Sequence, residues 1–120
     1  MGLRNVVITV TSAADGTATA TASHNIQGWL VQIDYVKVDF ADGVDVTFNF
    51  LNSLLTDAFL VMTNLNAAAI ITPRNFTTNR SGTTATSGES MAMIVSGRPS
   101  VTVAQAGDTK SGTFVFWFSD

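Results

Sequence analysis

Residues that could carry catalytic chemistry are few in this chain of 120 residues. It has one histidine, His24, one glutamate, Glu89, and no cysteine. Nucleophilic catalysis needs a nucleophile, a base and an orienting group that converge, and no spacing in the sequence supports a Ser-His-Asp set around His24. We therefore expect no catalytic residues and no cofactor, and we expect that the protein is not an enzyme.

The densest acidic group raises the question of a calcium site. It consists of four aspartates within twelve residues: Asp34, Asp39, Asp42 and Asp45. The spacing does not fit the Asp-x-Asp-x-Asp-Gly pattern of a calcium loop, and the odd offset between Asp34 and Asp39 sends them to opposite faces of a regular strand. We interpret these carboxylates as turn and surface groups and expect no metal site.

Three aromatic residues, Trp29, Tyr35 and Trp117, could form a platform for a sugar. Trp117 stands between Phe116 and Phe118, so in a strand it points away from the face that those two rings share. A strand with aromatic side chains on both faces is better explained by burial on both sides, against the core and against another protein chain. A carbohydrate site remains the alternative.

The charge of the chain argues against two classes of partner. Six Lys and Arg oppose nine Asp and Glu, which gives a net charge of −3. Affinity for nucleic acid that does not depend on its sequence comes from clustered cations, so we expect no nucleic acid partner. Uninterrupted apolar runs are far shorter than the 18 or so residues that span a bilayer, and we expect no membrane association.

Apolar residues recur with a period of two, which predicts strands. Alternation is clear over residues 6–11, 36–40, 44–50, 101–103 and 114–118, with turn signals such as Asp15-Gly16 and Asp42-Gly43 between the runs. The pattern predicts an all-β fold, a single antiparallel β-sandwich or barrel of the jelly-roll or Greek-key kind with about eight strands. We expect one domain over residues 1–120, with residues 1–25 as an arm or edge hairpin.

The parity of the apolar positions also predicts strand pairing. One hairpin would set Phe40 opposite Val46 and Val38 opposite Phe48, and a second would set Val103 opposite Phe114. The core is then expected to consist of the residues of shared parity: Val6, Ile8, Val36, Val38, Phe40, Val46, Phe48, Phe50, Val101, Val103, Phe114, Phe116 and Phe118.

Low charge and small side chains favour a surface that other protein chains cover. The run Thr17-Ala18-Thr19-Ala20-Thr21 is small on both faces, which suits an edge strand better than a core strand. We expect the segment 4–22 and the loop 73–89 to supply contacts with a partner. The candidate interface residues are Thr17, Thr19, Thr21, Trp29, Arg74, Phe76, Arg80 and Trp117.

The chain from Leu54 to its end resembles small β-rich head proteins of tailed bacteriophages, the capsid decoration or cement proteins. The likeness is carried by Leu60–Asn66 (LVMTNLN), by Thr72-Pro73-Arg74 and above all by Arg98–Phe114 (RPSVTVAQAGDTKSGTF). The resemblance implies a non-enzymatic virion protein on the outer capsid surface that binds the major capsid protein and stabilises the assembled shell. It also implies a homo-oligomer, for which we expect a trimer. A carbohydrate- or receptor-binding module of a phage tail is the alternative.

Overall fold

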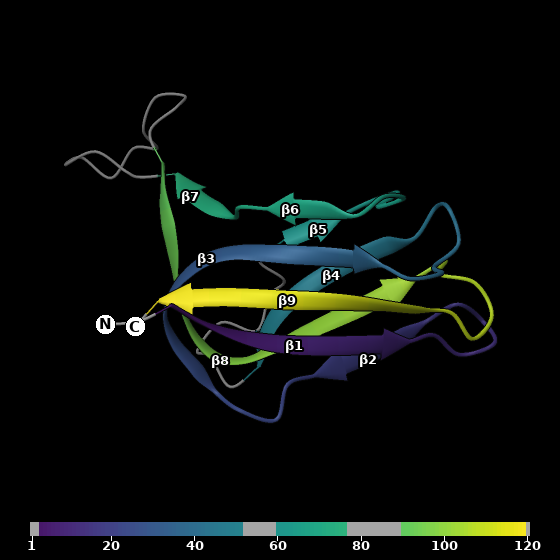
Figure 1. Ribbon diagram of the computed structural model, residues 1–120, viewed down its shortest axis with the longest axis horizontal. Helices are drawn as coiled ribbons and strands as arrows, with labels where there is room; N and C mark the ends of the chain where they lie inside the picture. The colour runs from purple at the N-terminus through teal and green to yellow at the C-terminus, as the bar shows by residue number, and fades with distance from the viewer. Residues whose placement is uncertain (1–2, 52–59, 77–89, 120) are drawn as a thin grey trace.

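A computed structural model of the chain describes residues 3–51, 60–76 and 90–119, which form nine β-strands (Figure 1). All strand pairs in it are antiparallel, and the prediction of an all-β sandwich is confirmed. None of the described residues form a helix that could cross a membrane. The strands are β1 (Leu3–Thr11), β2 (Ala18–Thr21), β3 (Ile26–Lys37), β4 (Asp45–Leu51), β5 (Leu60–Met62), β6 (Ala69–Ile71), β7 (Arg74–Phe76), β8 (Ser90–Ala104) and β9 (Ser111–Ser119).

Eight of these strands form two facing layers. One layer has the order β1-β9-β3-β6, and the other has the order β2-β8-β4-β5. The first layer lies in front of the second in Figure 1. Between most successive strands the chain crosses from one layer to the other, so neighbours in sequence face each other across the core. This is the strand arrangement of a jelly roll.

Strand β8 joins the two layers because it pairs in both of them. Its first part pairs with β3 as far as Gly97, and its second part pairs with β4 from Arg98 onward. Gly97 has a φ of 131°, a conformation that glycine adopts more readily than other residues, and so it suits the point where the strand changes sheets. Strand β7 pairs with the beginning of β8, and Figure 1 shows this pair extending away from the two layers.

Aromatic rings from the two layers meet in the core. Phe48 of β4 packs edge-on against Phe114 and Phe116 of β9, with ring centroids 5.6 and 6.0 Å apart. The predicted core residues of β4, β8 and β9 and Ile8 of β1 are buried, and Val6 packs against the cluster at its periphery. The prediction of inward-facing parity is therefore confirmed for these strands.

The predicted hairpin pairings are wrong. Phe48 pairs with Val101, and Val46 pairs with Val103, so β4 lies beside β8 and not beside β3. Phe114 pairs with Ile8 and Tyr35, so β9 lies between β1 and β3. The inward direction of the apolar residues is nevertheless correct, because strands that face each other across a sandwich also turn their apolar residues toward each other. The alternation of apolar residues does not show whether two strands face each other or are hydrogen-bonded neighbours.

The placement of Val36 and Val38 in the core is also wrong, since they are 49% and 59% exposed. The register between β3 and β9 shifts between Leu30 and Gln32, which leaves Val31 as an extra residue. Such a bulge reverses the alternation that follows it. Beyond it the side chains of Ile33 and Tyr35 point inward, and Val36 points to solvent.

Phe40 is buried as predicted, although it lies outside a strand. Strand β3 ends at Lys37, and the loop that follows carries the Phe40 ring over Gly112 of β9. The ring is 2% exposed, and its centroid is 6.3 Å from that of Tyr35. Burial of Phe40 therefore follows from the path of this loop and not from strand alternation.

The N-terminal segment supplies an edge strand to each layer. Strand β1 pairs with β9, and β2 pairs with β8. Among the described strands neither has a partner on its other side, and they do not pair with each other as a hairpin would. Two edges therefore lie at the same side of the sandwich.

Candidate binding face

The eight candidate interface residues do not form one site. Trp29 and Trp117 project from the outer face of the first layer, whereas Thr19 and Thr21 project from the outer face of the second. Thr17 lies in the turn between β1 and β2. Arg74 and Phe76 are in β7, and Arg80 lies outside the described residues.

Thr17 helps to build its turn. Its hydroxyl and its backbone N–H both donate to Oδ1 of Asp15, at 2.8 and 3.1 Å. These hydrogen bonds, the one from the hydroxyl first, lower the pKa of the Asp15 carboxyl. The turn also contains Gly16, whose φ of 83° a residue with a side chain adopts only with strain.

The outer face of the first layer carries most of the strongly exposed apolar side chains in the described residues. We call it the Trp117 face. Of the eight strongly exposed large apolar side chains in the described residues, five project from it: Leu3, Val7, Trp29, Val36 and Ile70. It consists of the outward side chains Leu3, Asn5, Val7, Thr9, Thr11, Trp29, Gln32, Asp34, Val36, Ile70, Ser111, Thr113, Val115, Trp117 and Ser119.

A hydrogen-bonded group occupies the middle of the Trp117 face. The indole Nε1 of Trp117 donates to Oδ2 of Asp34 at 3.0 Å, and Nε2 of Gln32 donates to Oδ1 at 2.7 Å. Trp117 pairs directly with Gln32, so its indole leans diagonally from β9 toward Asp34 on β3. All three side chains are half-buried. The indole therefore lies along the sheet, and its orientation is fixed by the carboxylate.

The outer face of the second layer is polar. We call it the threonine face, and its hydroxyl groups bond in pairs across strands. The Oγ1 atoms of Thr19 and Thr102 are 3.0 Å apart, and Thr21 lies 3.1 Å from Ser100 in the same manner. Its outward side chains are Thr19, Thr21, Asp45, Thr47, Asn49, Val61, Ser100, Thr102 and Ala104.

The remaining aspartates of the acidic group are separate from one another and position loops. Asp39 accepts a hydrogen bond from the Ser111 backbone N–H, and Asp45 accepts from Asn64 and Gln105. The carboxylate of Asp42 lies 3.4 Å from the ammonium of Lys37. Within residues 3–51, 60–76 and 90–119, no three His, Asp or Glu side chains are grouped as a metal would require.

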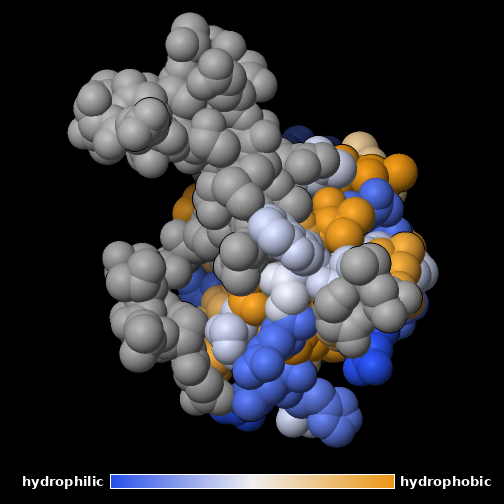
Figure 2. Space-filling model, turned by 90° about the vertical axis from the view of Figure 1, so that its left-hand side faces the viewer, coloured by the Kyte–Doolittle hydropathy of each residue, from blue (hydrophilic) through white to orange (hydrophobic). Residues whose placement is uncertain are grey.

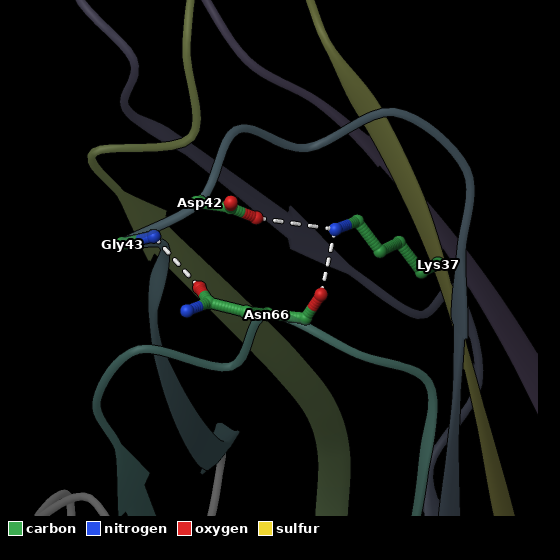
Figure 3. A network of polar contacts seen from close by, with 4 residues as sticks. All are labelled: Lys37, Asp42, Gly43 and Asn66. Atoms are coloured by element: carbon green, nitrogen blue, oxygen red, sulfur yellow. Dashed lines mark hydrogen bonds and ion pairs between the residues drawn. The ribbon is translucent and has the colours of Figure 1, made fainter.

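Figure 3 shows how Lys37 and Asp42 join two loops of the sandwich. The Lys37 ammonium also donates to the backbone carbonyl of Asn66 at 2.6 Å, and the Asn66 side chain accepts from the Gly43 N–H at 2.7 Å. The loop between β3 and β4 is thereby tied to the segment before β6. These polar groups have structural partners and do not form an open site.

A groove of about 310 Å³ opens at the other end of the sandwich. It is lined by Arg4, Asn25, Ile26, Gln27 and Phe118. Figure 2 views this end and shows hydrophilic and hydrophobic residues mixed on its surface. His24 is exposed in the loop beside the groove. Its imidazole ring makes no hydrogen bond to another described residue. The described residues that line the groove do not include an acid and a base that converge.

Tyr35 does not belong to a platform with Trp29 and Trp117. It is 2% exposed and stacks on Phe114 inside the sandwich, with centroids 5.0 Å apart. Burial raises the pKa of its hydroxyl above the ordinary value of 10.0. Of the three aromatic residues considered for a sugar platform, only the two tryptophans lie on the surface. They are diagonal to each other across β9 and β3.

Comparison with known protein families, with curated proteins and with solved structures finds no match for this chain. The candidate site is therefore defined by its geometry. Sequence reasoning identified Trp29 and Trp117 but did not connect them with Asp34, Gln32, Val7 or Ile70. The alternation of Val7 with the inward Ile8 was a signal for an apolar outer face, whereas the contact between Trp117 and Asp34 depends on a pairing of β3 with β9 that parity does not reveal.

Proposed function

We propose that this protein is a capsid decoration protein of a tailed bacteriophage, a non-enzymatic virion component that binds the major capsid protein on the outer surface of the shell and stabilises it. The observation that carries the proposal is the Trp117 face. Soluble monomers rarely expose large contiguous apolar areas, and such areas mark interaction sites. The resemblance of residues 98–114 to decoration proteins supplies the class of partner.

Self-association is part of the proposal. Strands β1 and β2, which have no further strand partner among the described residues, lie side by side at one edge of the sandwich. Natural proteins cover such edges to prevent uncontrolled pairing. Closed cyclic symmetry would bury the edges of every copy in the same way. We propose a trimer, as the resemblance implies.

A carbohydrate- or receptor-binding module of a phage tail is the second candidate. It is favoured by one observation, the presence of two tryptophans, a carboxylate and an amide on the same sheet face. Sugar recognition combines an aromatic surface with a few placed polar groups. The capsid proposal ranks first because the exposed aliphatic side chains Val7, Val36 and Ile70 surround this group and would gain little from a sugar.

The test is addition of the purified protein to emptied capsids of the phage whose genome encodes it. The proposal expects saturable co-sedimentation at a fixed copy number per shell. The contact should persist in about 1 M salt, where the screening length is about 3 Å, because it is mainly apolar. Failure to co-sediment, together with binding of Trp29 and Trp117 to a glycan on an array, would replace it with the second candidate.

A further inference from the structure

Among the described residues, Asp34 is the only charged one with an outward side chain on the Trp117 face. In its row across the sheet, Asp34 lies between Val115 of β9 and Ile70 of β6, and Val115 is followed by Val7 of β1. Val7 is 58% exposed, and Ile70 is 72% exposed. A single carboxylate thus has aliphatic groups on both sides in its row, near the middle of this face.

The carboxylate is held in place by neutral donors. Gln32 and Trp117 each donate to a different oxygen of Asp34, at 2.7 and 3.0 Å. Within the described residues, no cation lies at ion-pair distance from it. Each oxygen keeps a second lone pair, so Asp34 retains the capacity to accept hydrogen bonds from a partner.

Covering this face has an electrostatic consequence. A carboxylate that loses its water destabilises the complex unless an opposite charge and further hydrogen bonds replace the lost hydration. An apolar partner surface would leave Asp34 buried without compensation. A second copy docked through the same face about a two-fold axis near its centre would bring two Asp34 carboxylates together, which adds repulsion.

We propose that the protein surface that covers the Trp117 face presents an arginine, whose guanidinium pairs with Asp34 and stacks on the indole of Trp117 inside a ring of aliphatic contacts. This inference rests on the proposed function, in which another protein covers the face. It names the side chain through which the partner recognises the Trp117 face. It also excludes a second copy of this chain, docked through the same face, as that partner.

Arginine fits the group better than the other candidates. Its planar guanidinium can donate two parallel hydrogen bonds to a carboxylate and lie against an aromatic face, whereas lysine is a strongly hydrated point charge. A sugar hydroxyl could donate a charge-assisted hydrogen bond to Asp34, but it brings no opposite charge to replace the lost hydration of the carboxylate. The Asp34 carboxylate and the Trp117 indole beside it therefore favour a partner group that is both cationic and planar.

The direct test uses nuclear magnetic resonance of the intact protein. The chain has two tryptophans, so two indole N–H signals are expected, which Trp29→Phe would assign. The probe is the blocked peptide acetyl-Leu-Arg-Leu-amide, compared with the same peptide carrying citrulline, a neutral isostere of arginine. We expect millimolar concentrations of the arginine peptide to shift the Trp117 signal and the citrulline peptide to bind at least about tenfold more weakly.

Two variants sharpen this test. Asp34→Asn preserves the shape but removes the charge and one of the two acceptor oxygens, so the amide oxygen can accept from Gln32 or from Trp117 but not from both. This variant should abolish the preference for arginine over citrulline. Asp45→Asn removes a carboxylate of the threonine face and should leave the preference unchanged. Equal binding of both peptides to the wild type, or a shift produced by chitohexaose or cellohexaose but by neither peptide, would overturn the inference, the latter in favour of a sugar.

Shell binding separates this inference from the proposed function. Asp34→Asn should bind emptied capsids at least about 30-fold more weakly than the wild type, because it leaves the partner's cation buried without its pair. Unchanged shell binding by the variant would reject the arginine contact while the decoration role stands. A wild type that prefers the arginine peptide but does not bind shells would reject the decoration role and retain the chemistry of the face.

Discussion

The outer faces of the two sheets differ sharply although the inner faces share one core. On the Trp117 face, five large apolar side chains are strongly exposed, whereas on the threonine face Val61 is the single exposed one in the described residues. Both sheets are stabilised by the same inward rings, so folding alone does not require an apolar outer face. The first layer therefore exposes apolar side chains on its outer face, whereas the outward side chains of the second layer are mainly polar.

Hydroxyl pairs show where the apolar area ends. On the Trp117 face, Thr9 lies 3.4 Å from Thr113 and Thr11 lies 3.1 Å from Ser111, both toward the loop end of β1 and β9. Hydroxyl pairs of the same kind join β2 and β8 on the threonine face. Val36 shares the row of Thr9 and Thr113, and the other four strongly exposed apolar side chains of this face lie beyond that row on the side of Trp117.

The largest expected effect comes from the core that both faces share. Phe48→Ala should lower the free energy of unfolding by about 3 to 5 kcal/mol, because Phe48 is fully buried against Phe114 and Phe116. Denaturant unfolding followed by circular dichroism and by tryptophan fluorescence would measure it. Both probes should move together, and a loss below about 1 kcal/mol would show that the two sheets do not pack as described.

A second substitution tests how the sheets close at the loop end. A Cβ at position 112 would collide with the Phe40 ring, so Gly112→Ala should cost about 1 to 3 kcal/mol through overpacking. The adjacent Ser111→Ala changes an outward, half-buried position and is the matched control, expected within about 0.5 kcal/mol of the wild type. Equal stability of the two variants would mean that Phe40 does not cover Gly112.

A third substitution addresses the buried hydroxyl beneath the Trp117 face. The Tyr35 hydroxyl has no hydrogen-bond partner within the described residues, so Tyr35→Phe should raise stability by up to about 1 kcal/mol. Because burial raises the pKa of Tyr35, ionisation of its hydroxyl opposes folding. This effect is absent below pH 10.0, and stability falls as the pH rises above this value.

The pH dependence can be read without interference, since Tyr35 is the only tyrosine. Absorbance of tyrosinate should appear at higher pH in the folded protein than after denaturation in urea. In Tyr35→Phe, the tyrosine-linked decline in stability above pH 10 should disappear. Titration of the folded protein at the ordinary pKa would contradict the burial of this side chain.

The smallest expected effect concerns the polar face. A double-mutant cycle that replaces Thr19 and Thr102 with Val should give a coupling energy of about 0.2 to 1 kcal/mol, as expected for a cross-strand pair. Thr19 with Thr47 serves as the control, because β8 separates their strands. A coupling energy of zero between Thr19 and Thr102 would show that their hydroxyl contact does not stabilise the sheet.

Alternation along the chain was enough to predict the fold class and most of the core. Phe48, Val101 and Phe116 face inward because each belongs to a strand whose period of two is unbroken. The pairing of strands was not predictable in this way, since inward residues of facing and of neighbouring strands show the same parity. The bulge at Val31 was likewise hidden, because its only trace is an additional residue in an apolar strand.

The candidate site was predictable only in its aromatic part. Trp117 was expected to point away from the core because its neighbours Phe116 and Phe118 point inward, and it does. Its contact with Asp34 joins residues that are 83 positions apart, and only the pairing of β9 with β3 brings them together. The distribution of Thr19 and Trp117 over opposite faces follows from the same long-range topology.

Shell binding by a matched pair of lysine variants tests the central claim, that the Trp117 face is the surface the partner covers. Val7→Lys adds a charge to this face, and Thr47→Lys adds the same charge to the threonine face, each at an outward strand position. The free energy of unfolding of both variants should lie within about 0.5 kcal/mol of the wild-type value. We predict that Val7→Lys loses co-sedimentation with emptied capsids and that Thr47→Lys retains it, and loss of binding by Thr47→Lys with normal binding by Val7→Lys would contradict the account.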